Sequence, residues 1–319
     1  MKAIRFHEFG GPEVLRFEEV PDPVAGPGEA LLRVHAVGVN PTDITTRSGR
    51  GNTRPGFSFP AMFGRDACGT VEALGDGVTS LAVGDRVVVR EADYTYAEMA
   101  VAKEQQLYKV PDALGNLEAA AVGVTYATAW DAVVNRANVQ SGETVLVQGA
   151  AGGVGIAAVQ IAKYLGATVI GTSASDDKLK WAATQGVDHG VNYSASDWPA
   201  QVKELTGGKG VDVIIDGVGG DPFIRCFECI VPEGRIAMFG AAAGREITFN
   251  INGIFRNMLT LLGGGGRGTS RADFERLLEL LAAGKLTPTI DRTWPLSEAA
   301  EAQRYVEERR VLGKVVLTV

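Results

Sequence analysis

One stretch of the chain constrains its fold more than any other, the run TVLVQGAAGGVGIAAVQIAK from Thr144 to Lys163. Its first five residues, Thr144 to Gln148, are mostly apolar and β-branched, which is typical of a parallel strand covered on both faces. A glycine-rich turn follows, and a helix is predicted to begin near Gly153. This order of strand, glycine turn and helix is that of a pyrophosphate-binding site, in which the first helical amides and the helix dipole face the phosphates.

The turn carries the pattern G-x-G-x-x-G with alanine at the first position. Gly152 would let the backbone approach a phosphate, and Gly155 would let the helix pack against the strand. A similar turn also occurs where a strand and a helix simply pack closely, so the turn alone leaves both interpretations open. The residues predicted to bind the cofactor here are Ala150, Gly152, Gly153, Val154 and Gly155.

The residues that follow favour a dinucleotide and indicate its type. The ribose-reading position, about 20 residues after the turn, falls on Ser173. Sites that prefer NAD usually carry Asp or Glu there, and a carboxylate would repel the 2′-phosphate of NADP. Ser173, Ser175 and Lys178 therefore predict NADP(H) rather than NAD(H). The nearby Asp176 and Asp177 are explained by the dipole of the next helix, at whose N-terminus they lie.

Strands and helical segments alternate as far as residue 266, which predicts an α/β protein with a doubly wound parallel sheet. The further strands predicted are Ala167–Thr172, Val187–Asn192, Val211–Asp216, Arg235–Gly240 and Met258–Gly263. Ligands of such sheets lie beyond the carboxyl ends of the strands, and glycine there permits close backbone approach. These ends add Val218, Gly240, Ala241 and Gly264 to the predicted cofactor-binding residues.

The first 120 residues have a different pattern, in which short apolar runs alternate with turns. No long helical period appears, so a curled antiparallel sheet is predicted. Its predicted strands are Lys2–Phe6, Glu29–Val37, Ala67–Leu74, Asp85–Val89 and Tyr96–Val101. A long helix is predicted next, from about Leu117 through Val134.

Composition limits the partners. The 319 residues include 31 basic and 38 acidic side chains, a net charge of −7 with no basic cluster, so nucleic acid is not an expected partner. No run of about 18 apolar residues occurs, and the first residues are charged, so we expect a cytoplasmic protein that does not associate with membranes. Three cysteines are too few for a disulfide framework, and Cys226 and Cys229 are predicted to be packed thiols rather than a redox or metal site.

Two stretches near the N-terminus concentrate polar side chains. One contains Asn40 and Asp43, and the other contains Arg65 and Asp66. A purely structural interpretation makes Asn40 and Pro41 a turn, Asp43 a helix cap, and Arg65 with Asp66 a surface pair. Composition alone favours that interpretation at least as much as catalysis.

Six motifs, taken in order, resemble the medium-chain dehydrogenases/reductases, and within them the zinc-free quinone oxidoreductase branch, which is zeta-crystallin-like. They are GVNPTD (38–43), GRDACGTV (64–71), VGDRV (83–87), GVTYATAW (123–130), AAGGVG (150–155) and GKVVL (313–317). The resemblance implies a GroES-like catalytic domain over residues 1–121 and an NADP-binding Rossmann domain over 122–266. A C-terminal segment, 267–319, would return to the catalytic domain.

The resemblance also implies an enzyme that works without a metal. Zinc-dependent members of the superfamily hold the catalytic zinc with two cysteines and a histidine, and these positions fall here on Asn40, Arg65 and Ala121. None of the three is a good zinc ligand. The lobe of four cysteines that holds a structural zinc is missing as well.

For residues outside the glycine turn, the resemblance suggests further roles. Thr125 would lie against the nicotinamide, Tyr193 would stack on the adenine or bond the 2′-phosphate, and Lys314 would lie near the pyrophosphate. Each has a structural alternative: a hydrogen bond within its own helix, a core aromatic, and a cap on the sheet. The strand Met258–Gly263 would pair across a homodimer, as the sixth strand commonly does in the family.

The resulting hypothesis is an NADPH-dependent reductase that transfers hydride to a quinone or to the β-carbon of an α,β-unsaturated carbonyl. Asn40 and Thr125 would order the nicotinamide and the substrate, Asp43 would anchor the turn at Asn40, and Arg65 would steady a developing oxyanion. Two alternatives stay open. One is an enoyl- or acrylate-type reductase with a specific metabolite as substrate, and the other is an NADPH-binding protein with a structural or regulatory role and little turnover.

Overall fold

The computed structural model describes residues 1–51 and 57–319, and the chain divides into two compact units. Unit 1 comprises Met1–Val124 and Pro288–Val319, and unit 2 comprises Thr125–Thr287. Each unit has its own sheet, and we describe each by itself.

Residues 267–287 belong to unit 2, whereas the predicted boundaries assign them to the returning C-terminal segment. This segment contains helix α8 (Arg271–Ala282), which buries one apolar face that includes Phe274 and Leu277. Just before α8, the hydroxyl of Thr269 donates a hydrogen bond to the carbonyl of Ala127 (2.7 Å). The return to unit 1 therefore begins only after α8.

Unit 2 is built on a six-stranded sheet in which every pair of neighbouring strands is parallel. The order β10-β9-β8-β11-β12-β13 is that of a doubly wound sheet, as predicted. The strands are β8 (Thr144–Val147), β9 (Thr168–Ser173), β10 (His189–Asn192), β11 (Val211–Asp216), β12 (Ile230–Met238) and β13 (Thr260–Gly263). The helices between them are α3 (Gly153–Tyr164), α4 (Asp176–Ala183), α5 (Trp198–Leu205), α6 (Gly220–Cys226) and α7 (Asn252–Arg256).

The core of unit 2 explains why its strands have nearly continuous apolar runs. Leu146, Ile170 and Ile214 of three adjacent strands are buried against Trp198 of α5 and Phe223 of α6. Because helices cover the parallel strands, side chains on both faces of the sheet leave water. This burial fixes the carboxyl ends of the strands, on which the candidate site depends.

Unit 1 contains a seven-stranded sheet among its described residues, with the order β14-β15-β3-β4-β5-β7 and with β6 also paired to β3. Its strands are β3 (Glu29–Gly38), β4 (Asp66–Leu74), β5 (Arg86–Arg90), β6 (Met99–Lys103), β7 (Leu107–Lys109), β14 (Ile290–Pro295) and β15 (Lys314–Thr318). A separate pair is formed by β1 (Lys2–Phe6) and β2 (Leu15–Glu19). The sequence predicted five of these strands, and it missed β2, β7, β14 and β15.

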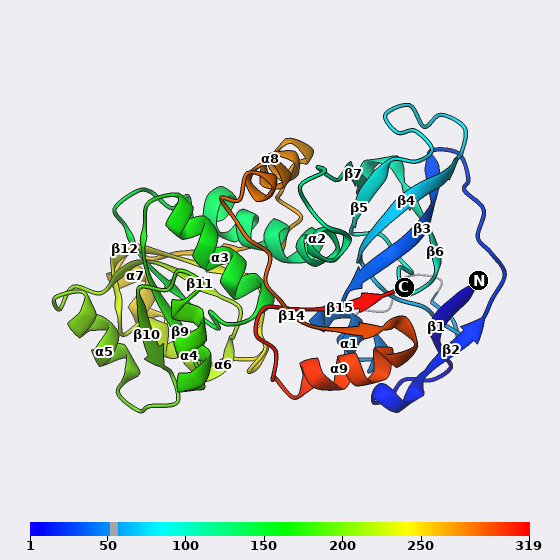
Figure 1. The fold of residues 1–319 in the computed structure, drawn as a ribbon. Helices are drawn as coiled ribbons and strands as arrows, with labels where there is room; N and C mark the ends of the chain where they lie inside the picture. The colour runs from blue at the N-terminus through cyan, green and yellow to red at the C-terminus, as the bar shows by residue number, and fades with distance from the viewer. Residues whose placement is uncertain (52–56) are drawn as a thin grey trace. The chain divides into compact units, whose positions relative to one another are not determined.

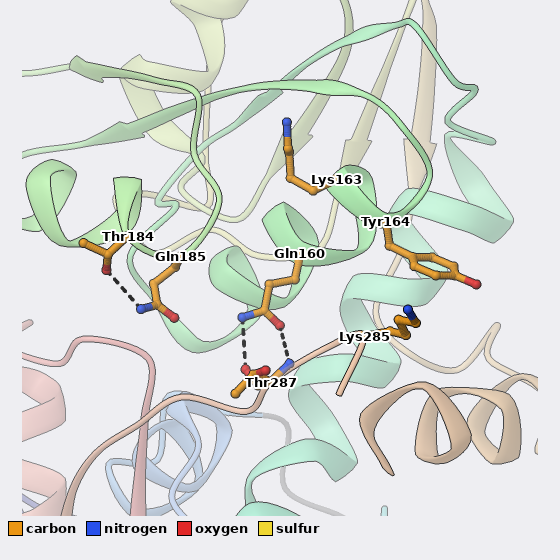
Figure 2. Close-up of a pocket in the computed structure, with 7 residues that line it drawn as sticks. All are labelled: Gln160, Lys163, Tyr164, Thr184, Gln185, Lys285 and Thr287. Carbon is orange, nitrogen blue, oxygen red and sulfur yellow. Dashed lines mark hydrogen bonds between the residues drawn. The ribbon is translucent and has the colours of Figure 1, made fainter. Parts of the chain in front are cut away.

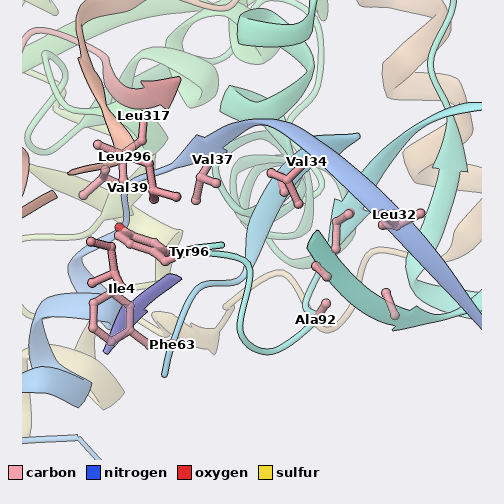
Figure 3. Packing of buried hydrophobic residues seen from close by; sticks show 14 of the residues in the cluster. Ile4, Leu32, Val34, Val37, Val39, Phe63, Ala92, Tyr96, Leu296 and Leu317 are labelled. Atoms are coloured by element: carbon pink, nitrogen blue, oxygen red, sulfur yellow. The ribbon is translucent and has the colours of Figure 1, made fainter. Parts of the chain in front are cut away.

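The C-terminal strand completes the sheet of unit 1. Strand β15, red in Figure 1, runs antiparallel beside β3, with Val316 opposite Gly38. Figure 3 shows the core behind it, where Leu296 and Leu317 from the C-terminal segment lie near Val37 and Val39. The chain thus returns to unit 1 because these apolar side chains are buried there.

Helices α1 (Pro41–Arg47) and α9 (Ala299–Glu307) belong to unit 1, and α2 (Asn116–Trp130) runs from unit 1 into unit 2. The predicted helix 117–134 is therefore correct in place, but it changes character near its end. Residues 131–136 form a π-helical turn, in which the amide of Ala137 bonds to the carbonyl of Ala132 (2.9 Å). Single π turns of this kind are frequent at functional sites.

All three cysteines lie in the described part of the chain, and all are free and buried. Burial raises the pKa of the Cys229 thiol to about 12 and also raises that of Cys226. Both are therefore packed, protonated thiols, as predicted. In the residues that the structure describes, no helix has both the length and the apolar character needed to cross a bilayer.

Candidate functional site

The glycine turn between β8 and α3 is closed by its own backbone. The amide of Gly152 donates to the carbonyl of Gly149 (3.0 Å), and the amide of Ala150 donates to the carbonyl of Thr172 on β9 (2.9 Å). Gly152 is the N-cap residue of α3 and has no side chain to accept a bond from the first turn. The helix therefore presents its first amides and the positive end of its dipole at the carboxyl edge of the sheet, where an anion is stabilised.

The residues of the turn are small for different steric reasons. A Cβ at Gly155 would overlap the carbonyl oxygen of Gly149, so glycine alone lets α3 pack so closely. A Cβ at Gly152 would lie 3.5 Å from the same oxygen, an ordinary contact, so the protein itself does not require glycine there. The missing side chain leaves space beside the turn. The methyl group of Ala150 fills space left by Gly171 on β9, which accounts for alanine at the first position of the pattern.

The end of β9 brings together four of the predicted residues. Ser173 is the last residue of β9, is buried, and lies opposite Asn192 of β10. The amide of Tyr193 donates to the carbonyl of Ser173 (3.0 Å). Ser175 is the N-cap residue of α4, and Lys178 lies in the first turn of that helix. These four residues therefore form one group beside the glycine turn.

Two carboxylates lie close to this group but do not occupy the end of β9. Asp176 accepts a hydrogen bond from the side chain of Asn192 (2.8 Å), and Asp177 pairs with Lys180 (3.1 Å). Both are the first residues of α4. Their place is explained by the helix dipole, as predicted.

At the end of β11, a buried carboxyl group organises the backbone. Asp216 accepts hydrogen bonds from the amides of Val218 (3.1 Å) and Gly219 (3.0 Å). Burial raises the pKa of Asp216 to about 6, and the two amide bonds limit this rise. Gly240 and Ala241 follow the next strand, β12, at the same edge of the sheet.

Strand order indicates how a dinucleotide would cross this edge. The glycine turn follows β8 and the predicted ribose reader ends β9, so the other half of the molecule would extend toward β11, β12 and β13. The loop after β13 begins beside the end of β12, because the amide of Gly264 donates to the carbonyl of Met238 (2.7 Å). Val218, Gly240, Ala241 and Gly264 thus line one edge.

Unit 1 holds a second group, a buried polar cluster at the start of α1. Asn40 is the N-cap residue, and Asp43 Oδ2 accepts from the amide of Asn40 (2.8 Å) and from the hydroxyl of Tyr96 (3.0 Å). The side chain of Asn40 donates to Asp66 Oδ2 (3.0 Å) and accepts from Lys314 Nζ, which lies 3.3 Å from Asp66 Oδ2. None of these five residues, here called the Asn40 cluster, is more than 5% exposed.

The structure corrects part of the simple interpretation of this region. Asn40 does begin a helix and Asp43 does cap it, but Asp66 is fully buried and is not part of a surface pair. Arg65 is half-buried, and its Nε has no hydrogen-bond partner among the described residues. The apolar run after Asp66 was the available signal, because it marks the first residue of a buried strand. Tyr96 was missed altogether.

Burial dominates the electrostatics of the Asn40 cluster. It raises the pKa of Asp43 to about 7, although the Asn40 amide, Lys314 and the Tyr96 hydroxyl oppose this rise. It also raises the pKa of Asp66, against the attraction of Lys314 and the hydrogen bond from Asn40. Two carboxyl groups thus share one ammonium group in a place without water to screen them.

For two predicted site residues, Thr125 and Lys314, the structure gives a position but does not test the predicted role. Thr125, predicted to lie against the nicotinamide, is buried in α2. Lys314, predicted near the pyrophosphate, has its ammonium group bound to Asn40 and Asp66. Both roles stay predictions.

The three positions at which zinc-dependent relatives carry metal ligands hold an amide, a guanidinium and a methyl group, at Asn40, Arg65 and Ala121. Within the described residues, no group of three His, Cys, Asp or Glu side chains is arranged to hold a metal ion. The chemistry of these side chains does not suit zinc.

A separate pocket of about 480 Å³ lies at the other end of α3 from the glycine turn (Figure 2). Two of its polar side chains, Gln160 and Lys163, already have partners. Gln160 bonds to both the amide and the carbonyl of Thr287 (2.9 and 3.0 Å), and Lys163 pairs with Asp188 (2.8 Å). We therefore assign the candidate site to the glycine turn and the strand ends, and not to this pocket.

Comparison with known families agrees with both units. Residues 26–127 match the family described as "Alcohol dehydrogenase GroES-like domain", and residues 153–283 match "Zinc-binding dehydrogenase". A quinone oxidoreductase of Sus scrofa is 35% identical over 99% of this chain and 97% of its own length. A 2-haloacrylate reductase of a Burkholderia species is 33% identical over 99% of this chain and 98% of its own length.

Solved structures give the same result for the fold. A structure described as an NAD-dependent alcohol dehydrogenase is 38% identical, with a TM-score of 0.94 and full coverage of both chains. The quinone oxidoreductase of Escherichia coli, solved in complex with NADPH, is 30% identical, with a TM-score of 0.93 and full coverage of both chains. Because full-length relatives exceed 30% identity and carry the same two folds, the chain belongs to the quinone oxidoreductase family of the medium-chain dehydrogenases/reductases.

Proposed function

We propose that this oxidoreductase uses NADPH to transfer hydride to a quinone or to the β-carbon of an α,β-unsaturated carbonyl, without a metal. The observation that carries the proposal is the glycine turn after β8 together with an adjacent strand, β9, that ends in Ser173 and not in a carboxylate. The turn fits a pyrophosphate for two reasons. The first amides of α3 are free, and Gly152 beside them has no Cβ to occupy the space that a phosphate would take.

The choice of NADPH over NADH is supported by the residues at the end of β9. Ser173 replaces the acidic residue that would accept bonds from the ribose, and Ser175 and Lys178 add a hydroxyl and a cation. The relative solved with NADPH agrees with this choice. Another relative is described as NAD-dependent, so the binding test below uses both cofactors.

The names of the relatives support the two substrate classes. One is a quinone oxidoreductase and another reduces a 2-haloacrylate, so both a quinone and an activated double bond occur among close homologues. Neither reaction needs a Lewis acid if the carbonyl is polarised by hydrogen bonds. This agrees with the absence of thiol and imidazole groups at Asn40, Arg65 and Ala121.

When bound, the cofactor supplies the hydride, and the protein supplies binding and orientation. The amides of Gly153, Val154 and Gly155 would hold the pyrophosphate, and Ser175 and Lys178 would hold the 2′-phosphate. Thr125 and Arg65 are the proposed polar groups for nicotinamide and substrate. The side chain of Asn40, predicted to share this role, is instead buried and bonded to Asp66 and Lys314. The buried Asn40 cluster keeps the start of α1 rigid, and the final proton would come from water.

The proposal is tested by NADPH oxidation with a panel of quinones, 2-haloacrylates and enoyl thioesters. Turnover with quinones or simple enones supports it, whereas turnover restricted to one acyl substrate favours the enoyl or acrylate reductase. Tight NADPH binding without turnover on any member of the panel favours a binding protein. Failure to bind NADPH would reject all three.

Replacement of Lys178 by alanine is expected to weaken NADPH binding about tenfold or more while leaving NADH binding nearly unchanged, because a charge-assisted bond to the 2′-phosphate is lost. Calorimetric titration with both cofactors measures the two dissociation constants. Lys180→Ala is the matched control, since Lys180 is a lysine of the same helix and is not predicted to bind the 2′-phosphate. An equal effect of both variants on NADPH would refute a specific role for Lys178.

We also propose a homodimer formed through the edge strand β13. In the described part of the chain, β13 pairs only with β12, so its outer edge is open. Beside it lie exposed apolar side chains, Ile251, Phe255 and Met258, each at least 60% exposed. An open edge next to apolar surface fits a two-fold interface between copies.

Accordingly, Phe255→Glu is expected to convert the dimer to a monomer, because it places a charge in the apolar part of the interface. Light scattering coupled to size-exclusion chromatography gives the mass. The control is Phe17→Glu, which changes an exposed phenylalanine on β2 and should leave the mass unchanged. A wild-type chain that is monomeric at high concentration would reject the interface.

A further inference from the structure

Four consecutive glycines, residues 263–266, end β13 and begin the loop after it, and a buried side chain from another segment holds this loop. Asp131 Oδ2 accepts hydrogen bonds from the amides of Gly265 (3.1 Å) and Gly266 (3.3 Å). Glycine backbones have more conformational freedom than any other, so such a loop needs an external anchor to keep one shape. Asp131 is that anchor.

Asp131 is itself fixed on both sides. It is 1% exposed and begins the π-helical turn 131–136 that follows α2. Its second oxygen, Oδ1, lies 3.2 Å from Nε of Arg136, so this one carboxylate makes three polar contacts. The packing is tight, since a Cβ at Gly268 would overlap Oδ1.

Further bonds tie the same loop to the same helical segment. Asn135 donates to the carbonyl of Gly268 (2.9 Å), next to the bond from Thr269 to Ala127. Thr128 lies directly against Gly266, because a Cβ at Gly266 would be 3.1 Å from the hydroxyl of Thr128. Thr128 is one helical turn after Thr125, so the two threonines lie on neighbouring positions of one face.

The position of this loop follows from the strand order. With the pyrophosphate at β8 and the 2′-phosphate at β9, the nicotinamide half of the cofactor extends over β11, β12 and β13. The loop 263–266 continues β13 at that edge. Its shape therefore bears on the nicotinamide half and not on the adenosine half.

We propose that Asp131 is a positioning residue for hydride transfer, which fixes the loop 263–266 against the helix of Thr125 in the shape that receives the nicotinamide half of NADPH. The inference rests on the proposed function. Asp131 does not touch the cofactor, because both of its oxygens are occupied by the loop amides and Arg136. Asp131 restricts the conformations of the loop before NADPH binds, so that binding costs less conformational entropy.

The test compares the whole cofactor with its adenosine half. In Asp131→Ala, we expect the dissociation constant for NADPH to rise about tenfold or more and kcat to fall, while that for 2′,5′-ADP stays within about twofold of wild type. Calorimetry gives both constants. Asp131→Asn keeps an acceptor for the loop amides and is expected to recover part of the NADPH affinity.

Asp212→Asn is the matched control. Asp212 also accepts a backbone amide, that of Thr144 (2.7 Å), but at the amino ends of the strands. Its replacement is expected to lower the melting temperature without changing either dissociation constant. If Asp131→Ala does not fold, Gly268→Ala is used in its place, because the new methyl group at residue 268 would displace the carboxylate of Asp131.

The outcomes separate the inference from the proposed function. A wild-type protein that binds neither NADPH nor 2′,5′-ADP would overturn both. Normal binding by wild type, with an Asp131→Ala variant that loses affinity for both ligands equally or for neither, would overturn the role of Asp131 alone. Selective loss of NADPH affinity with retained 2′,5′-ADP affinity supports it.

Discussion

Replacing Lys314 by methionine is expected to lower the free energy of unfolding by about 3–5 kcal/mol, because it leaves buried carboxyl groups without their cation. Asp66 is fully buried and its nearest charged group is Lys314 Nζ at 3.3 Å. Without Lys314, Asp66 must either keep an uncompensated charge or take up a proton. Thermal and urea unfolding of the wild type and the variant measure the loss.

A double variant shows whether charge is the cause. In Lys314→Met with Asp66→Asn, the buried cation and one buried anion are removed together, so most of the stability lost in the single variant should return. Lys163→Met is the control for an exposed pair, since Lys163 and Asp188 are each about one-third exposed. It should cost less than about 1 kcal/mol. An equal loss in the single and double variants would attribute the effect to packing.

The parts of the fold that could be predicted are those in which the information is local. The strand from Thr144, the glycine turn and the helix from Gly153 lie within one short run, and each element has its own apolar period or turn residue. The alternation that continues to β13 predicted the doubly wound sheet for the same reason. Alanine at position 150 was understood only with the structure, because the residue that makes room for its methyl group, Gly171, lies on another strand.

The Asn40 cluster could not be predicted because its contacts join distant parts of the chain. Tyr96 is 53 residues from Asp43, and Lys314 is 248 residues from Asp66 and 274 from Asn40. No local pattern places these side chains together. Asp131 is a similar case, since the glycine amides that it binds are 134 and 135 residues away. Local sequence thus predicts where a ligand binds better than what holds the binding groups in place.

The stability of unit 1 is expected to fall as the pH rises from about 4 to about 8, through the ionisation of Asp43. Burial raises the folded-state pKa of Asp43 to about 7 from its ordinary value of 3.8. Between these values the folded chain holds a proton that the unfolded chain has released, so raising the pH favours unfolding. A difference of about 3 pKa units corresponds to about 4 kcal/mol, reached in full above about pH 7.

Asp43→Asn removes this titration and keeps an oxygen that accepts from the Asn40 amide and the Tyr96 hydroxyl. The melting temperatures of variant and wild type should therefore be similar near pH 4 and diverge as the pH rises, with the variant the more stable. Asp216→Asn is a matched control in unit 2, where the pKa is raised only to about 6, so its divergence should end about one pH unit lower. A difference between Asp43→Asn and wild type that does not change with pH would mean that Asp43 is already ionised in the folded chain at low pH. Lys314 would then compensate both carboxylates of the cluster, and the loss in Lys314→Met should exceed that expected from Asp66 alone.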